Sequence, residues 1–156
     1  MMDFTERDYF FMKMALEEAR RAIEKEEVPV GAVLISPRGE VLAIAHNEIL
    51  IRGDPTAHAE MLVLRRGAEI LGNYRLLGCK LYVTLEPCAM CAYAMVLARI
   101  DELIFATPDP KTGAVVSLYS ILSDKRLNHQ VKYRFGLLQK EAELMLKNFF
   151  KGKRLF

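Results

Sequence analysis

The sequence predicts an α/β fold in which helices cover both faces of a five-stranded sheet. Short apolar runs alternate along the chain with longer segments whose apolar residues recur at helical spacing, a pattern typical of such sheets. Glycine and proline separate these segments, and no repeat or Gly/Ser-rich linker divides the 156 residues. We therefore expect a single domain over residues 1–156.

The first part of the chain predicts a helix, a hairpin and a second helix. Thr5 is a suitable N-cap, and the stripe that follows consists of Tyr9, Met12, Ala15, Leu16, Ala19, Ala22 and Ile23. The apolar runs 30–35 and 41–46 flank a Ser-Pro-Arg-Gly turn, which predicts two antiparallel strands. Asp54 and Pro55 predict the start of a second helix, which Gly72 ends.

Strands and helices continue to alternate in the remainder of the chain. We expect strands at 81–85, 103–106 and 131–135 and helices at 87–98 and 115–122. The stripe of a last helix consists of Ala142, Met145, Leu146, Phe149 and Phe150. The expected sheet is mixed, with an antiparallel hairpin first and largely parallel strands later, and sites in such sheets lie where strands end and helices begin.

Composition limits the classes of function. Hydrophobic residues make up 52% of the chain and charged residues 27%, which excludes a disordered chain. The net charge of +2 argues against binding to nucleic acid by bulk charge alone, but a local basic patch could still contact phosphates. The longest apolar run, 89–98, is half of a membrane span, and the N-terminus is acidic where a secretory signal would be basic. We expect a cytoplasmic protein with no membrane segment.

Two short motifs carry candidate chemistry, and each falls at a predicted helix start. His58 and Glu60 form an H-x-E motif, and Cys88 and Cys91 form a P-C-x-x-C motif. Cysteines three apart in a helix share a face, so they can bind one ion, and the positive end of the helix favours their thiolates. With His58 they give three protein ligands, which is the open arrangement of catalytic zinc with water in the fourth position.

Glu60 is the candidate general acid/base. In a regular helix its side chain would point away from that of His58, so it should not be a fourth ligand, but at a frayed first turn it could reach the metal-bound water. Zinc lowers the pKa of bound water from about 15.7 to about 7. Because H-x-E together with P-C-x-x-C is the signature of zinc nucleobase deaminases, the sequence predicts the hydrolytic removal of an exocyclic amine.

Two other interpretations of the cysteines stay open. Cys88 and Cys91 could form a thioredoxin-like redox pair, although this leaves the His58 motif without a role. Cys79 could close the site as a fourth, structural ligand, which would make the protein a binding module. In its apolar context, however, a free cysteine is more typically a small buried hydrophobe.

Longer segments around these motifs resemble the bacterial tRNA-specific adenosine deaminases. Residues 54–60 read DPTAHAE, residues 84–91 read TLEPCAMC, and the resemblance spans nearly the whole chain. It also includes the segments 27–33, 46–47, 73–76, 111–114, 128–129 and 149–151, of which the first two are shared with deaminases of free bases. The chain departs from the family at Tyr93 and at 115–116, where many members have glycine, and at Glu48, where a basic residue is frequent.

The resemblance implies a cytidine-deaminase-like three-layer α/β/α sandwich, a homodimer and one Zn²⁺ per subunit. It implies conversion of the wobble adenosine of a tRNA anticodon stem-loop to inosine by zinc-bound hydroxide. By position, His58, Cys88 and Cys91 would bind zinc and Glu60 would shuttle protons. The other implied roles are a base-pocket wall for Val30, a hydrogen bond to the flipped purine for Asn47, and RNA contacts for Asp109, Lys111, His129, Phe150 and Arg154.

Several of these residues also have simpler explanations. His46 is expected to be a hydrogen-bonded structural group, and His129 could be one as well. Packing of the last helix would leave Phe150 exposed to stack on a base. The concentration of Lys147, Lys151, Lys153 and Arg154 favours RNA contact over a solvated helix end. A small-molecule deaminase acting on guanine or cytosine is the second hypothesis, because the zinc motifs do not distinguish the substrates.

Overall fold

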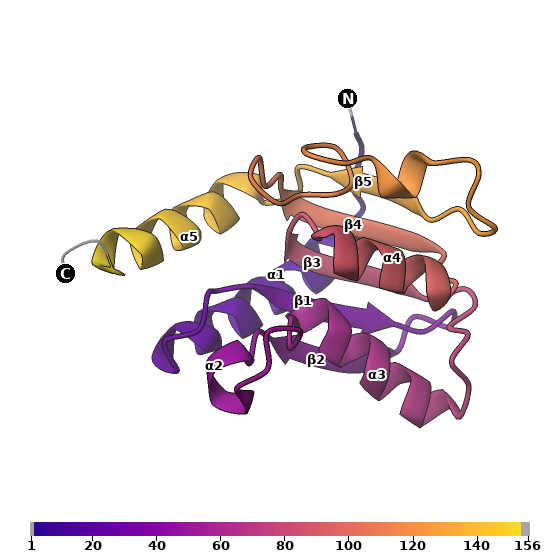
Figure 1. Ribbon diagram of the computed structural model, residues 1–156, viewed down its shortest axis with the longest axis horizontal. Helices are drawn as coiled ribbons and strands as arrows, with labels where there is room; N and C mark the ends of the chain where they lie inside the picture. The colour runs from indigo at the N-terminus through magenta and orange to yellow at the C-terminus, as the bar shows by residue number, and fades with distance from the viewer. Residues whose placement is uncertain (1, 154–156) are drawn as a thin grey trace.

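The computed structural model describes residues 2–153 and contains a five-stranded sheet between two layers of helices (Figure 1). The strands are β1 (Gly31–Ile35), β2 (Val41–His46), β3 (Lys80–Leu85), β4 (Glu102–Thr107) and β5 (Lys132–Phe135). They lie in the order β2-β1-β3-β4-β5, and β1 is antiparallel to both of its neighbours, whereas β3, β4 and β5 are parallel. The predicted mixed sheet, with its antiparallel hairpin, is confirmed.

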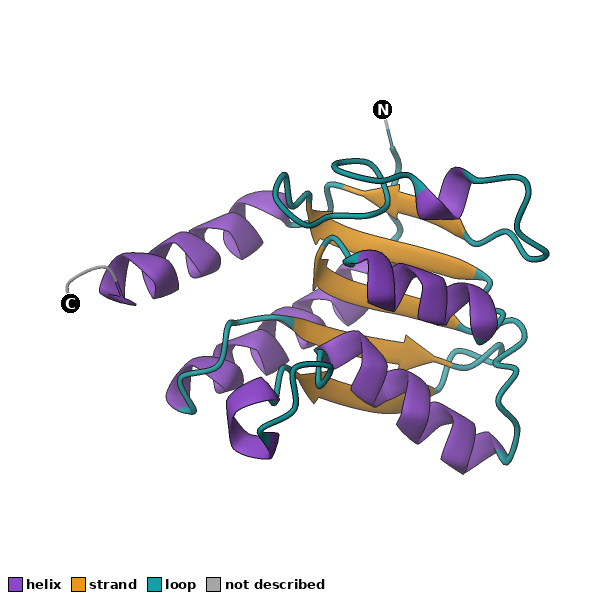
Figure 2. Cartoon of the chain, in the orientation of Figure 1, coloured by secondary structure: helices purple, strands orange, loops and turns teal. Residues whose placement is uncertain are grey.

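The helices divide between the two faces of the sheet (Figure 2). Within residues 2–153 they are α1 (Glu6–Glu24), α2 (Ile49–Arg52), α3 (Ala59–Leu71), α4 (Ala89–Leu97) and α5 (Gln139–Lys153). Val33 and Tyr82 pack with α1 and the start of α5, whereas Leu34 and Leu81 pack with α3 and α4. The predicted α/β/α sandwich is therefore confirmed. In this described part of the chain, no helix combines the length and apolar character needed to cross a bilayer.

Close packing of α1 fixes the start of β1. Thr5 is the N-cap of this helix, as predicted. Its hydroxyl accepts the N–H of Asp8, and the Asp8 carboxylate accepts the N–H of Thr5. A side chain at Gly31 would overlap the backbone of Ala15 in α1, so glycine is needed there. This contact anchors Val30, which directly precedes β1.

Two helix predictions are wrong. Residues 115–122 form turns and the short 3₁₀ helix Ile121–Ser123, because the N–H groups of Val115 and Val116 donate to the distant Glu86 carboxylate. The second long helix begins at Ala59 and not at residues 54–55. The Asp54 side chain accepts both the N–H and the hydroxyl of Thr56, and this folds the chain into a turn before the helix can start.

The last helix packs less than its sequence predicts. Ala142 is its one buried residue among those described, and Met145 packs against the same core. Leu146 and Phe149 are half-buried, and Phe150 is exposed. The stripe does not pack along its whole length because α5 projects beyond the sheet (Figure 1).

Candidate metal centre

The predicted metal ligands lie at one edge of the sheet, where β3 and β4 end. Because β1 is antiparallel to them, its start lies at this edge, and so does the end of β2. The N–H of Gly31 donates to the Thr84 hydroxyl at 3.1 Å, and the N–H of Asn47 donates to the carbonyl of Val30 at 3.2 Å. These bonds tie the strand ends together beside the starts of α3 and α4.

His58, Cys88 and Cys91 form a group that could hold one metal ion. The Nδ1 of His58 lies 3.7 Å from the Sγ of Cys88 and 3.5 Å from the Sγ of Cys91, and all three donor atoms lie within 4.8 Å of one another. A tetrahedral zinc with Zn–S bonds of about 2.3 Å and a Zn–N bond of about 2.0 Å separates its ligand atoms by roughly 3.5–3.8 Å. The donors and their spacing therefore fit zinc, with a fourth position left for another ligand.

Local backbone geometry explains why these side chains converge. His58 is the N-cap of α3 and Cys88 is the N-cap of α4, and both have an extended backbone, with ψ of 150° and 176°. Cys91 follows in the first turn of α4. Two helix N-termini therefore meet at the group, and their partial positive charge favours thiolate ligands.

The three donors change one another's pKa. A hydrogen bond from the Cys91 thiol, opposed by burial and assisted by His58, lowers the pKa of Cys88 to about 4. The same bond, together with burial, raises the pKa of Cys91. The hydrogen bond with Cys88 likewise raises the pKa of His58. The group thus presents a thiolate at neutral pH, which is the form that binds metal.

Glu60 is buried beside this group. Its side chain is 4% exposed, and burial raises its pKa to about 7. The Cys91 thiol and the charge of His58 act in the opposite direction and lower this pKa, but burial dominates. The side chains of His58 and Glu60 were expected to point apart because they are two residues apart in a helix. His58 precedes the helix, so this expectation does not apply. A carboxyl group with a pKa near 7 can both accept and donate a proton at neutral pH.

Val30 and Asn47 lie at the same edge. Val30 is buried, and its carbonyl holds the backbone of Asn47. The Asn47 side-chain oxygen accepts the N–H of Ala59, the first residue of α3, at 2.8 Å. The other end of the Asn47 amide carries two N–H donors. Asn47 therefore links β2 to the helix that presents His58 and Glu60.

Residues 109–117 follow β4 and also lie at this edge. Ala114 donates its N–H to the carbonyl of Pro87 at 2.8 Å, directly before Cys88. Lys111 is exposed. The Asp109 carboxylate accepts the N–H of Lys111 at 3.1 Å and the hydroxyl of Thr112 at 2.7 Å, so it also shapes its own turn.

Glu86 is a candidate that the sequence analysis did not single out. Its side chain is 2% exposed and accepts the N–H groups of Asp109, Val115, Val116 and Ser117. Burial alone would raise the pKa of Glu86, but these bonds and that from the Ser117 hydroxyl lower it. The sequence does contain a signal for this residue, because an acidic side chain stands between an apolar strand and the P-C-x-x-C motif. A carboxylate at such a place is expected to be buried, and a buried carboxylate needs hydrogen-bond donors.

The remaining RNA-contact candidates are not brought to the metal group within one chain. The Nε2 of His129 lies 2.7 Å from the carbonyl oxygen of Ile100, near the start of β4. The metal group lies at the other end of β4, so about 17 Å, the length of that strand, separates His129 from it. Phe150 is exposed on the projecting part of α5, in edge contact with Phe149. Arg154 lies outside the described residues.

Two other polar groups are structural. His46 is buried, with its Nδ1 2.9 Å from the carbonyl of Asn47 and its Nε2 3.2 Å from the Nζ of Lys25, so its expected structural role is confirmed. Cys79 is buried at the opposite end of β3 and does not join the metal-binding group. The closed four-ligand interpretation is therefore wrong.

Comparison with known proteins links the chain to zinc deaminases. Residues 5–107 match the model of the cytidine and deoxycytidylate deaminase zinc-binding region. The tRNA-specific adenosine deaminase of Aquifex aeolicus is 50% identical over 145 residues, which cover 93% of this chain and 95% of that protein. That of Bacillus subtilis is 46% identical over 147 residues, which cover 94% and 91%. A zinc-binding match favours metal binding over the redox interpretation.

Solved structures agree with these matches. A structure from a study of A-to-I editing by tRNA:A34 deaminases at the wobble position of transfer RNA has a TM-score of 0.84 and 46% identity, with 88% of this chain and 99% of that chain covered. A guanine deaminase from Bacillus subtilis has a TM-score of 0.62 and 25% identity, with 98% and 96% covered. Proteins named for different bases therefore share this fold.

Proposed function

The chain belongs to the tRNA-specific adenosine deaminases, within the cytidine and deoxycytidylate deaminases, and from this we propose that it converts the wobble adenosine of a tRNA anticodon loop to inosine. One observation supports hydrolytic deamination at a metal: Glu60 is buried beside three donor atoms that are spaced for zinc. The tRNA substrate is supported by identity over nearly the full length of the tRNA-specific enzymes.

His58, Cys88 and Cys91 would hold one zinc ion per subunit. When bound, the ion supplies a Lewis acid that makes water nucleophilic near neutral pH. The neutral imidazole and the two thiols, as thiolates, provide the electron pairs. The packing of α3 and α4 against the sheet holds these donors in place before the metal arrives, so little reorganisation is needed.

Glu60 would move the protons of the reaction. Its carboxylate accepts a proton from the attacking water as the water oxygen bonds to C6 of the purine, and passes that proton to N1. The proton of the new C6 hydroxyl then passes through the same side chain to the exocyclic amine. The C6–N bond breaks, ammonia leaves and the C6 carbonyl of inosine forms. The burial of Glu60 beside the three metal donors supports this role, because a carboxylate there lies close to where the water would be activated.

Val30 and Asn47 would hold the base. The buried Val30 side chain offers an apolar wall, and the N–H groups of Asn47 can donate to a purine acceptor while its oxygen remains bonded to Ala59. A loop adenosine costs only a few kcal/mol to unstack, which makes an anticodon loop a favourable target.

The RNA loop would be contacted by residues around the metal edge and on α5. Asp109 and Lys111 belong to the segment beside Pro87, and the projecting end of α5 carries the exposed Phe150 and three lysines. His129 lies at the opposite edge, so any contact that it makes with the RNA would be away from the metal group. A tRNA substrate also implies a cytoplasmic enzyme.

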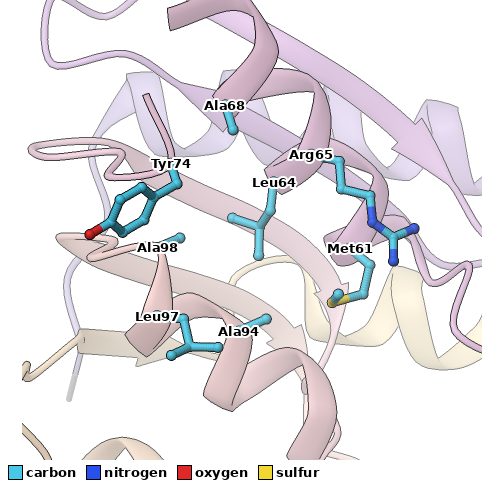
Figure 3. A pocket seen from close by; sticks show the side chains of 8 residues that line it. All are labelled: Met61, Leu64, Arg65, Ala68, Tyr74, Ala94, Leu97 and Ala98. Atoms are coloured by element: carbon cyan, nitrogen blue, oxygen red, sulfur yellow. The ribbon is translucent and has the colours of Figure 1, made fainter. Parts of the chain in front are cut away.

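A homodimer would form through the groove between α3 and α4 (Figure 3). The groove has a volume of about 210 Å³ and is lined by Met61, Leu64, Arg65, Ala68, Tyr74, Ala94, Leu97 and Ala98. Leu97 and Tyr74 are more than half exposed, and apolar patches of this kind are typical of protein interfaces. A twofold axis can place the same patch on both subunits. Native mass measurement should give a dimer, and Leu97→Glu a monomer.

The function is tested by offering purified protein an anticodon stem-loop, free adenosine, guanine and cytosine. We expect inosine and ammonia in equal amounts from the stem-loop, with much slower or no conversion of the small molecules. Guanine deamination without stem-loop deamination would instead support the small-molecule alternative, which the fold similarity to the guanine deaminase keeps open. A stem-loop with guanosine at the wobble position is the matched negative substrate.

A further inference from the structure

The Glu86 carboxylate gathers donors from two turns of the segment that follows β4. One oxygen accepts the N–H of Asp109 at 2.9 Å and the Ser117 hydroxyl, and the other accepts three consecutive N–H groups, those of Val115, Val116 and Ser117, at 2.8 to 3.0 Å. These five hydrogen bonds occupy all of the roughly four lone-pair sites of the carboxylate, with at least one site shared.

The segment is wrapped closely around this side chain. A Cβ at Gly113 would overlap the carboxyl group of Glu86, so the backbone passes directly against it. The N–H of Glu86 itself donates to the carbonyl of Thr107 at 2.9 Å. Residues 109–117 contain no helix or strand. The bonds to Glu86 and that of Ala114 to Pro87 hold this segment against the end of β3, while Asp109 stabilises the turn within it.

The position of Glu86 connects this segment to the metal group. Glu86 is followed by Pro87 and Cys88, and the segment that it binds carries Asp109 and Lys111. One side chain therefore joins the strand end that presents a metal donor to the loop that we assign to substrate contact. Any displacement of 109–117 would move these two residues relative to His58 and Glu60.

We propose that Glu86 is a positioning residue for the deamination, which fixes residues 109–117 beside the metal group so that the substrate-contacting wall is formed before RNA binds. This inference rests on the proposed function for the identity of the substrate. It assigns Glu86 no contact with substrate. Its effect is to remove the entropy cost of ordering this segment upon binding, and so to lower the KM.

Glu86→Gln tests the proposal, because the glutamine keeps the shape but turns an amide NH₂ toward backbone N–H groups, leaving donors without an acceptor. We expect zinc content to stay native. Hydrogen exchange at residues 115–117 should accelerate by about tenfold or more. The KM for the stem-loop should rise about tenfold, with kcat changed less than about threefold.

Glu27→Gln is the matched control. Glu27 is also a buried carboxylate, and it accepts the N–H groups of Leu50 and Ile51 at 2.9 and 3.0 Å. The substitution should accelerate exchange in α2 and leave residues 115–117 as in the native protein. Ser117→Ala removes only the hydroxyl bond to Glu86 and should raise the KM in the same direction by about threefold.

Native exchange at 115–117 and a native KM in Glu86→Gln would overturn the proposal. If that variant does not fold or loses zinc, Ser117→Ala decides, and a native KM with native exchange in it overturns the proposal too. A failure of the proposed function looks different: the native protein would not deaminate the stem-loop. Faster exchange confined to 109–117 in Glu86→Gln would still support the positioning role, toward another substrate.

Discussion

The metal group and the segment 109–117 lie at the same edge of the sheet but are held in different ways. His58, Cys88 and Cys91 lie at the starts of two helices that are packed against the sheet. The segment 109–117 has no regular structure and takes its conformation mainly from bonds to Glu86. This difference separates the region that would perform the reaction from the region that would bind the substrate. Damage to the first region should abolish turnover, whereas damage to the second should weaken substrate binding and leave the metal in place.

The largest effect is expected when a metal donor is removed. Cys88→Ser replaces a thiolate with a hydroxyl that does not ionise near neutral pH, so zinc should be lost and kcat/KM should fall more than about a thousandfold. Elemental analysis and a turnover assay measure the two losses. Cys79→Ala is the matched control, because Cys79 is buried outside the metal-binding group, and it should keep zinc. Native zinc content in Cys88→Ser would contradict the assignment.

The next effect separates metal binding from proton transfer inside the first region. Glu60→Gln keeps the shape of the side chain but cannot accept a proton. We expect one zinc per chain and a kcat lowered by about 10²- to 10⁴-fold, which single-turnover kinetics can measure. A kcat within about twofold of the native value would show that another group moves the protons.

A smaller effect is expected in the second region. Gly113→Ala inserts a methyl group where the Glu86 carboxyl lies, so the segment 109–117 must shift. The KM for the stem-loop should rise about tenfold while zinc is retained. Gly72→Ala is the control at a glycine outside the segment. Gly72 lies at the far end of α3 with open space around it, and its φ of 64° strains the backbone of any other residue at that position. The substitution should lower the melting temperature only. Equal KM values in the two variants would remove the distinction between the regions.

The smallest effect on catalysis is expected for a carboxylate outside both regions. Asp8 accepts the Tyr82 hydroxyl at 2.6 Å and the Arg134 guanidinium at 3.2 Å. Burial would raise the pKa of Asp8, but these bonds and that from the N–H of Thr5 lower it. Its stabilisation is therefore present above the unfolded pKa of about 3.9 and is lost as the pH falls through the folded pKa.

Asp8→Asn should accordingly lower the melting temperature by about 2–6 °C at neutral pH. The difference from the native protein should shrink as the pH falls below the unfolded pKa of about 3.9, and it should vanish below the folded pKa of Asp8, where both chains carry an uncharged side chain at this position. Zinc content, kcat and KM should stay native. A melting difference that is the same at pH 3 and pH 7 would show that the charge of Asp8 does not stabilise the fold.

The two regions also differ in how far their structure could be predicted from the sequence. His58, Cys88 and Cys91 stand at strand and helix boundaries that local patterns identify, and the structure brings these three together. The segment after β4 gave a wrong prediction because Val115 to Leu122 have helical spacing, while their backbone donors bond to Glu86, about 30 residues earlier in the chain. A contact at that sequence separation leaves no periodic signal.

Other differences have similar physical causes. The Asp54 turn delays the second long helix to Ala59, and this delay makes His58 an N-cap and lets Glu60 lie beside it. The apolar stripe of α5 predicted that the whole helix packs against the core. Its second half does not, because the helix extends past the sheet. The length of a helix relative to its support is a property of the whole fold, which local periodicity does not contain.

X-ray absorption at the zinc edge of the purified protein tests the central claim most directly. The structure predicts one zinc per chain, with two sulfur neighbours at about 2.3 Å and two nitrogen or oxygen neighbours at about 2.0 Å. The sulfurs would be those of Cys88 and Cys91, the nitrogen would be that of His58, and solvent would supply the remaining neighbour. A spectrum with three or four sulfur neighbours, or a protein that binds no stoichiometric zinc, would contradict the account.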